Sequence, residues 1–496
     1  MEHWDFEAAA LVGAVVLLVA VAAAGLSTRI GLPSLLLYLG LGALLGEDAI
    51  GVHFDDLEVT KLAGYAALIV ILAEGGLTTP WRRVRSAVPL AAVLSTVGTA
   101  VSVLVVAVAA HALLDMSWRT AMLTGAVVSA TDAAAVFSVL RRVPMHPRLS
   151  GLLEAESGFN DAPVVILVIA LSSAHPGNPL EVTGRIALEL AVGTLVGLAV
   201  GRGGAFVLRR LALPASGLYP ISVLSLIVAS YGLAATLHGS GFLATYLAAL
   251  VLGNSGLPHR PTTRSFVEGL AWLAQIGLFV LLGLLADPSR LGREVGPALL
   301  VGTVLLLVAR PLSVFVSNLP FALRRRGLSW HEQVFTSWAG LRGAVPIVMT
   351  TVPGDRLLFD LTFVLVVVFT LVQAPTLPWV ARRTGVVTSG EATEIDIESS
   401  PLATLDADVL EVDVPAGSHL HGIELFELRL PAGAAVTLLV RDGKASVPAS
   451  TTPLRTGDRL LIVTTAHSRE LTERRLRAVS RSGRLASWRG DRGAAR

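Results

Sequence analysis

The stretch Glu156–Asp161, ESGFND, brings polar side chains directly before the apolar run APVVILVIALSSA. On a helix, Ser157 lies one turn from Asp161 and Glu156 one turn from Asn160, so these groups share one side. Carboxylate, hydroxyl and amide oxygens are the ligands that a hard cation prefers. The alternative is a helix start at the lipid headgroups, because acidic side chains favour helix N-termini. This stretch alone leaves both interpretations open.

A second polar pair, Thr131 and Asp132 in SATDAAAV, lies midway through a long apolar segment. A charge within a membrane costs free energy and usually serves a function. Irregular backbone at that depth is tolerated only where it faces protein or water. We therefore predict an interrupted helix beside an ion site. The alternative is a Thr-Asp pair that only caps a helix.

Two further charges lie in apolar surroundings: Arg342 in WAGLRGAVPIV and Glu74 in LIVILAEGGLTTP. An unpaired arginine inside a membrane would be very unfavourable, so Arg342 needs an acidic partner or backbone carbonyls. Glu74 is a candidate partner. We expect a structural Glu74–Arg342 ion pair.

The composition places these groups in a membrane protein. Of 496 residues, 53% are hydrophobic and only 15% are charged, and the mean hydropathy is +0.68. A soluble domain carries roughly a quarter charged residues. The absence of cysteine excludes disulfides, thiol catalysis and thiolate metal sites.

The apolar residues form about thirteen segments, each near the ~20 residues that span a bilayer. They predict an all-α polytopic membrane domain over residues 1–383. The segments are 8–27, 32–50, 60–78, 87–112, 118–140, 153–174, 184–211, 216–237, 239–254, 264–286, 294–318, 332–353 and 357–381. Segment 239–254 is short and the fifth is interrupted. Such helices in matching positions often mark the substrate site of a transporter and an inverted repeat.

The loops between these segments alternate in charge. Arginine-rich loops such as TTPWRRVRS and RRRGLSWHEQ lie on one side, and acidic loops such as GEDAIGVHFDDLE lie on the other. The positive-inside rule then predicts an external N-terminus and a cytoplasmic C-terminal region. The acidic leading residues Glu2, Asp5 and Glu7 argue against a cleaved signal peptide, which begins with basic residues.

The composition changes after Arg383. Residues 384–404 are polar and acidic and are predicted to be a linker. Residues 405–480 contain short alternating runs separated by turn signals and then a basic helix, which predicts a small α+β domain. We expect the basic tail 481–496 to be disordered. Its arginines would either be solvated or contact anionic lipid.

Three motifs in order, TDAAAV, ESGFNDAPV and GLRGAV, resemble the cation:proton antiporter-1 family. The resemblance covers the membrane domain, including GLPSLLLYLGLGALLG and SGFLATYLAALVLGN. It is nearest to the NhaP-type bacterial potassium/proton antiporters with a cytoplasmic appendage. Residues 405–475 are similar to the RCK C-terminal (TrkA-C) domain.

The resemblance implies inverted repeats, two discontinuous helices that cross in mid-membrane, and a homodimer in the bacterial plasma membrane. It makes Asp161 the carboxylate that takes either proton or cation, with Asn160 as its neutral neighbour. Arg342 would orient Asn160 with help from Glu74. The residues around the ion would be Thr131, Asp132, Glu156 and Ser157, with K⁺ or Na⁺ held at Asp161, Ser157, Glu156 and Thr131.

A transport mechanism follows from this chemistry. A carboxylate away from water loses solvation in its charged form, so a proton and a cation compete for Asp161. Because Asn160 is neutral, one titrating carboxylate predicts electroneutral exchange of one cation for one proton. The appended domain favours K⁺ over Na⁺ by analogy.

Two other functions are alternatives to cation/proton exchange. A cation channel or potassium uptake subunit gated by an RCK-like domain should carry a TVGYG-like filter, which this sequence lacks. An intramembrane enzyme using Asp132 and Asp161 lacks any protease motif, and no GxxxxGK[ST] phosphate loop is present. We expect no enzyme activity, no cofactor beyond the transported ions and no nucleic-acid partner.

The C-terminal domain is expected to be regulatory. Domains that it resembles bind small ligands, in some cases cyclic dinucleotides such as cyclic di-AMP. An assembly module without a ligand is the alternative.

Overall fold

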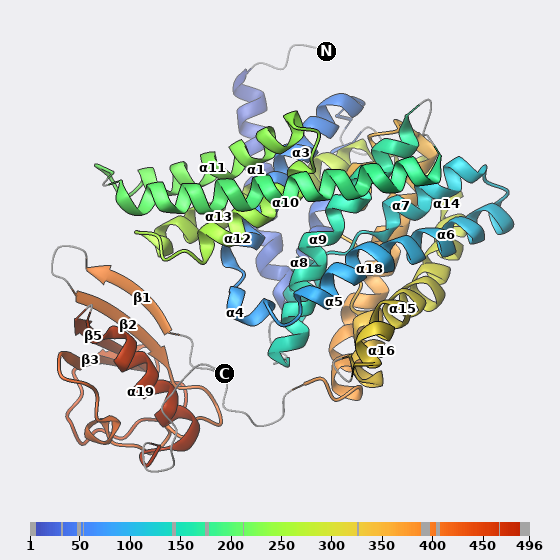
Figure 1. Ribbon diagram of the computed structural model, residues 1–496. Coiled ribbons are helices and arrows are strands. Elements are labelled where there is room, and N and C mark those ends of the chain that lie inside the picture. Colours follow the sequence, from blue (N-terminus) through green and yellow to red (C-terminus); the bar gives the residue numbers. More distant parts are fainter. Residues whose placement is uncertain are drawn as a thin grey trace. The chain divides into compact units, whose positions relative to one another are not determined.

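The computed structural model describes residues 6–30, 33–46, 51–52, 54–140, 145–173, 178–211, 213–324, 327–387, 397–402, 407–465 and 467–486. It has two compact units, Met1–Val387 and Thr388–Arg496 (Figure 1). The first is helical and the second combines a sheet with one long helix. The predicted fold class is confirmed.

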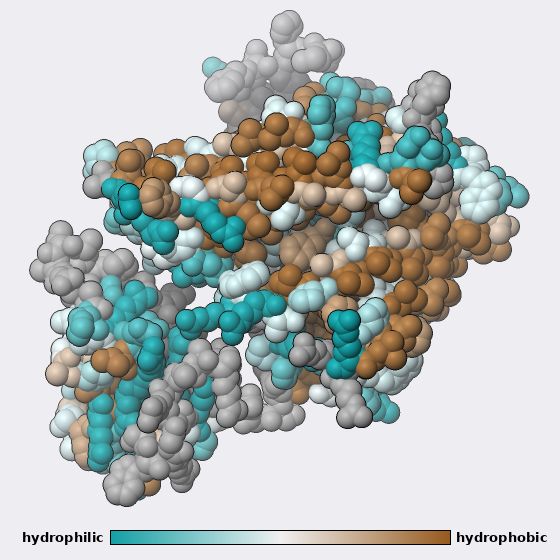
Figure 2. All heavy atoms as spheres, in the orientation of Figure 1, coloured by the Kyte–Doolittle hydropathy of each residue, from teal (hydrophilic) through white to brown (hydrophobic). Residues whose placement is uncertain are grey.

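The helical unit is built for a bilayer. Among the described residues, 8 helices are long and apolar enough to cross a membrane. Each predicted apolar segment coincides with one helix, with a helix containing a π-helical turn, or with a pair of short helices. Large hydrophobic side chains such as Leu18 of the first helix are exposed, and Figure 2 shows brown side chains along the helices of this unit.

The first of two helix bundles, here called the scaffold bundle, is held by close helix contacts. Its helices are α1 (Phe6–Ile30), α2 (Ser34–Leu45), α3 (Leu57–Thr78), α10 (Pro179–Arg210), α11 (Leu218–Thr236), α12 (Gly241–Gly253) and α13 (Arg260–Leu285). Gly42 of α2 and Gly283 of α13 face each other so closely that a Cβ on Gly283 would lie 3.0 Å from the Cα of Gly42. A larger side chain would separate these helices.

The second bundle, the site bundle, contains two similar sets of helices. Each set has a helix with a π-helical turn, then a broken helix, then a long unbroken helix. The first set is α5 (Val88–Val93), η1 (Leu94–Gly98) and α6 (Thr99–Leu114), then α7 (Trp118–Ser129) and α8 (Ala133–Leu140), then α9 (Pro147–Ser172). The second is α14 (Pro288–Val304), η2 (Leu305–Ala309) and α15 (Arg310–Ala322), then α16 (Trp330–Trp338) and α17 (Ala344–Thr350), then α18 (Arg356–Arg383). The short α4 (Trp81–Val84) lies between α3 and this bundle in the chain.

Segment 239–254 is short, as predicted, but its expected match to the interrupted fifth segment is wrong. That segment forms α12, which is short but unbroken and belongs to the scaffold bundle. Its glycines serve close packing instead: a Cβ on Gly253 would meet the backbone of Leu77 in α3. The break that matches the first one lies between α16 and α17, at residues 339–343.

The second unit is a five-stranded antiparallel sheet in the order β1-β2-β5-β3-β4, with α19 after the last strand. The elements are β1 (Ile397–Leu402), β2 (Ala407–Asp413), β3 (Ala434–Arg441), β4 (Lys444–Ser446), β5 (Arg459–Thr465) and α19 (Arg469–Ser482). It has its own apolar core, which includes Leu460, Ile462 and Leu476.

Two predicted boundaries of this unit need correction. β1 lies inside the expected linker, because it pairs with β2 from Ile397↔Val412 to Leu402↔Ala407. Helix α19 extends to Ser482, past the expected start of the tail. Residues 388–396 and 403–404 of the linker, 405–406 at the start of the predicted domain, and 487–496 of the tail lie outside the described residues.

Candidate cation site

The two broken helices cross at their breaks. The amide N of Asp132, between α7 and α8, donates a hydrogen bond of 2.8 Å to the carbonyl O of Leu341, between α16 and α17. A Cβ on Gly343 would overlap the Asp132 carboxylate, so any larger residue there requires Asp132 to move. The crossing therefore brings two chain segments together inside the site bundle.

Asp132 has two roles in this arrangement. Its carboxylate accepts a 3.2 Å hydrogen bond from the Ala135 amide N, which caps the start of α8, and it also lines a cavity. The capping interpretation and the ion-site interpretation of SATDAAAV are thus compatible. An acidic cap also compensates the positive N-terminal end of α8.

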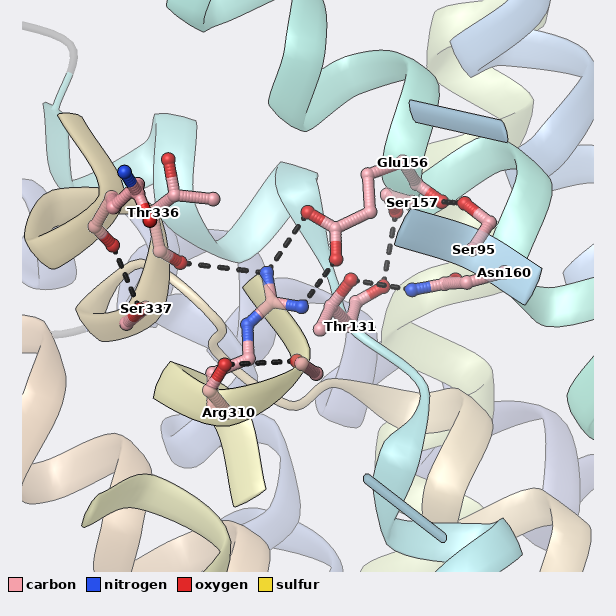
Figure 3. A network of polar contacts seen from close by, with 10 residues as sticks. Ser95, Thr131, Glu156, Ser157, Asn160, Arg310, Thr336 and Ser337 are labelled. Carbon is pink, nitrogen blue, oxygen red and sulfur yellow. Dashed lines mark hydrogen bonds and ion pairs between the residues drawn. The ribbon is translucent and has the colours of Figure 1, made fainter. Parts of the chain in front are cut away.

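Helix α9 carries ESGFND in its interior. The helix begins at Pro147, so Glu156–Asp161 do not form a helix start and the headgroup interpretation is wrong. Ser157 Oγ donates to the Thr131 carbonyl O at 3.1 Å, and Asn160 Nδ2 donates to Thr131 Oγ1 at 2.5 Å (Figure 3). These two bonds tie α9 to the first helix break.

Glu156 is held in an ion pair away from the cavity. Arg310 donates to both carboxylate oxygens, Nη1 to Oε1 at 2.5 Å and Nη2 to Oε2 at 2.9 Å (Figure 3). Ser95, in the first π-helical turn, donates to the Glu156 carbonyl O at 3.0 Å. Arg310 directly follows the second π-helical turn. Such turns often occur at functional sites, and here both place a side chain on Glu156.

The predicted Glu74–Arg342 pair does not form between these two described residues. Arg342 is buried in the second break, near Arg310 and Glu156, and its Nε and Nη1 have no hydrogen-bond partner in the described part of the chain. Glu74 is in α3 of the scaffold bundle, near Arg264 and Glu268. The prediction failed because Glu156 supplies the negative charge close to Arg342.

A cavity of about 530 Å³ lies between the two bundles. From the site bundle it is lined by Thr131, Asp132, Glu154, Ser157 and Asp161, and from the scaffold bundle by Glu74, Tyr246 and Glu268. No basic side chain is among the lining residues that the structure describes. The cavity therefore attracts cations and repels anions.

Asp161 is the carboxylate best placed to take an ion. It is buried, it lines the cavity, and its Oδ1 has no hydrogen-bond partner among the described residues. A buried carboxylate oxygen without a partner is costly unless a proton or cation joins it. Thr131, Asp132 and Ser157 lie around it in the same cavity wall.

Sequence reasoning missed Arg310, although a signal was present. Arg310 interrupts the apolar run VLLLVARPLSVFV, so the criterion that selected Arg342 also applies to it. Glu154 and Glu268 gave no such signal, because they lie near the ends of apolar segments. Their presence in the cavity depends on how the bundles pack.

Comparisons with known proteins agree with the fold and the motifs. The model of the family "Sodium/hydrogen exchanger, transmembrane" matches residues 14–383, and the TrkA-C domain matches residues 409–477. The chain is 35% identical over 455 residues to the K⁺/H⁺ antiporter NhaP of Alkalimonas amylolytica, covering 88% of this chain and 77% of that protein. It is 34% identical over 475 residues to the K⁺/H⁺ antiporter NhaP2 of Shewanella sp. strain MR-4, covering 91% and 80%.

A solved structure shares the fold of the helical unit. The sodium proton antiporter MjNhaP1 from Methanocaldococcus jannaschii superposes with a TM-score of 0.65 at 22% identity, covering 75% of this chain and 97% of that one. The expected resemblance is confirmed. The crossed helix breaks, the order of the three motifs and the match over residues 14–383 together show that this chain belongs to the transmembrane sodium/hydrogen exchanger family.

Proposed function

We propose that this protein is a secondary transporter that exchanges a monovalent cation, K⁺ in preference to Na⁺, for H⁺. The observation that carries the proposal is the buried Asp161 carboxylate, which presents an unpaired oxygen to a cavity lined by further carboxylates. The names of the two NhaP relatives support K⁺ as the cation. Ligands to the ion would be Asp161, Asp132, Ser157 and Thr131, while Glu156, with Arg310, positions α9.

The charges at the helix crossing support electroneutral exchange. Arg310 and Arg342 supply two positive charges, and Glu156, Asp132 and Asp161 supply three negative charges when all are ionised. One net negative charge is left among these five groups. Either one proton or one monovalent cation neutralises it, so both loaded forms cross the membrane with the same charge.

The cavity reaches the ends of helices that adjoin arginine-rich loops. Its lining includes Thr78 and Pro80 at the end of α3 and Glu268 in the first half of α13, next to the loops TTPWRRVRS and PHRPTTR. By the positive-inside rule this side is cytoplasmic, with the N-terminus outside and the C-terminal unit inside the cell. Movement of the site bundle past the scaffold bundle would expose Asp161 to the other side.

Lipid contact and a homodimer are part of this proposal. Helix α1 is supported on one side by α2 and leaves large apolar side chains exposed, among them Leu11, Leu18 and Val21. In a membrane this surface contacts lipid or a second copy of the chain.

The TrkA-C unit would regulate transport by binding a small ligand, for which cyclic di-AMP is the first probe. Calorimetric titration of the full-length protein in detergent is the measurement. Absence of heat and of a thermal shift would disfavour this nucleotide and favour an assembly role.

The exchange itself is tested in inverted membrane vesicles with a pH-sensitive dye. Addition of KCl should dequench the dye, with a smaller response to NaCl, across a range of pH. If neither salt produces a response although the protein is present in the vesicles, the proposal is wrong. In proteoliposomes, exchange driven by membrane potential alone would contradict electroneutrality.

A further inference from the structure

Gly158 of ESGFND has no place among the proposed cation ligands, yet it packs directly against α12. A Cβ placed on Gly158 would lie 2.5 Å from two ring carbons of Tyr246. The next residue, Phe159, meets the same ring edge-on, with centroids 5.7 Å apart and planes at 85°. A buried aromatic ring of the scaffold bundle thus rests on a glycine three residues before Asp161.

Helix α12 also packs closely against α3 and α10 of its own bundle. A Cβ on Gly76 of α3 would lie 2.7 Å from the Tyr246 carbonyl O, and one on Gly197 of α10 would lie 2.7 Å from the Ala244 carbonyl O. Backbones that meet this closely form a rigid unit. When the two bundles move relative to each other, α12 therefore moves with the scaffold bundle, and the displacement at this helix occurs between α12 and α9.

We propose that Gly158 and Tyr246 form the seam at which the site bundle moves past the scaffold bundle. Because Gly158 has no side chain, the surface of α9 can slide past the Tyr246 ring. Tyr246, whose helix is fixed by α3 and α10, restricts the direction of this movement. A methyl group at position 158 would penalise the packed arrangement seen here and shift the protein away from it. Tyr246 is then a positioning residue and not a ligand of the ion.

The natural lack of cysteine provides a direct test. Ala271 of α13 lines the cavity, so Ala271→Cys supplies a single reporter thiol inside it. Labelling by a membrane-impermeant maleimide in inverted vesicles measures how often the cavity is open to the cytoplasmic side. Exchange is measured in the same vesicles, and size-exclusion profiles check that each variant is folded.

In this background Gly158→Ala should lower the exchange rate about tenfold or more and slow the labelling. Adding Tyr246→Leu to Gly158→Ala removes the obstructing ring and should restore the labelling rate, with a partial recovery of exchange because the guiding ring is also lost. Tyr246→Phe keeps the ring and should be labelled at the same rate as the parent. These results together would support a steric seam.

Three outcomes would overturn the seam: Gly158→Ala exchanging and labelling like the parent, a folded double variant that is labelled as slowly as Gly158→Ala, or slowed labelling in Tyr246→Phe. The exchange readout rests on the proposed function, whereas the labelling readout does not. A parent chain without exchange would therefore overturn the antiport proposal, and labelling would still decide on the seam.

Discussion

Arg310 and Glu156, 154 positions apart in the chain, form a two-point ion pair in which both side chains are almost fully buried. Arg310 also donates to the Thr336 carbonyl O at 3.4 Å, near the end of α16. A single arginine thus joins the long helix that carries Asp161 to the second broken helix. Its loss should disturb the geometry of the whole site.

Arg310→Met would leave the Glu156 carboxylate buried without its partner. We expect a loss of stability of about 3–5 kcal/mol, because an unpaired buried charge is much costlier than none. Thermal unfolding in detergent measures it. The double variant Glu156→Gln/Arg310→Met should recover part of the loss, and the exposed Arg202→Met is the matched control. Equal melting temperatures for Arg310→Met and the control would contradict the structural role of the pair.

Asp161→Asn should abolish exchange and leave the protein folded. The amide has nearly the same shape as the carboxylate but can neither take up a proton in this pH range nor carry the charge that attracts a cation. Exchange in inverted vesicles and size-exclusion chromatography are the measurements. Asp360→Asn changes another buried carboxylate, in α18 outside the cavity lining, and should retain exchange. Retained activity in Asp161→Asn would remove this residue from the mechanism.

Gly343→Ala should impair transport through the helix crossing. The added methyl would run into the Asp132 carboxylate, so either Asp132 leaves its position or the two breaks separate. We expect exchange to fall about tenfold or more, since overpacking costs ~1–3 kcal/mol. Gly277→Ala in α13 is the control, because a Cβ there meets nothing within 4 Å. A cation KM and rate equal to those of the control would show that the crossing tolerates the methyl.

In the C-terminal unit, Asp458 should make stability depend on acid pH. Burial by itself raises the pKa of this carboxyl, but hydrogen bonds from Arg441, at 2.8 and 2.7 Å, and from the Arg455 amide, at 2.7 Å, outweigh it and hold the pKa below its usual 3.8. Because the pKa of Asp458 is lower in the folded state than in the unfolded state, its ionisation stabilises the fold fully at pH values above the unfolded-state pKa. This stabilisation is lost as the pH falls from the unfolded-state pKa through the folded-state pKa.

Urea unfolding of a fragment covering Thr388–Arg496 should therefore show stability falling below about pH 4. Asp458→Asn should lose about 1–3 kcal/mol at pH 7 and flatten this dependence. The control Glu470→Gln removes an exposed ion pair with Arg474 and should cost less than about 0.5 kcal/mol. An unchanged acid profile in Asp458→Asn would rule out this carboxyl as its source.

Most helices of the helical unit could be predicted from the sequence. A helix that crosses lipid needs a continuous stretch of apolar residues, and such a stretch can be recognised without knowing the rest of the fold. The break at Thr131 and Asp132 was visible for the same reason: a charge in mid-segment stands out against its surroundings. The second break, at residues 339–343, carries a similar signal, because Arg342 and two glycines interrupt its apolar segment. It was not located because Arg342 was interpreted only as the partner in an ion pair. The start of α9 at Pro147, well before the apolar run, was missed because its first turns are polar enough to resemble a loop.

The sequence by itself determined the number and order of the apolar segments, the polar residues that interrupt them, and the presence of a separate C-terminal domain. Only the tertiary structure decided which charges meet: Glu156 with Arg310 and not Glu74 with Arg342, and Asp161 facing a cavity with an oxygen left unpaired. The physical reason is that hydropathy depends on a residue and its neighbours in the chain. The partner of a buried charge depends instead on how two helix breaks and two π-helical turns, far apart in the sequence, orient side chains across the packed interior.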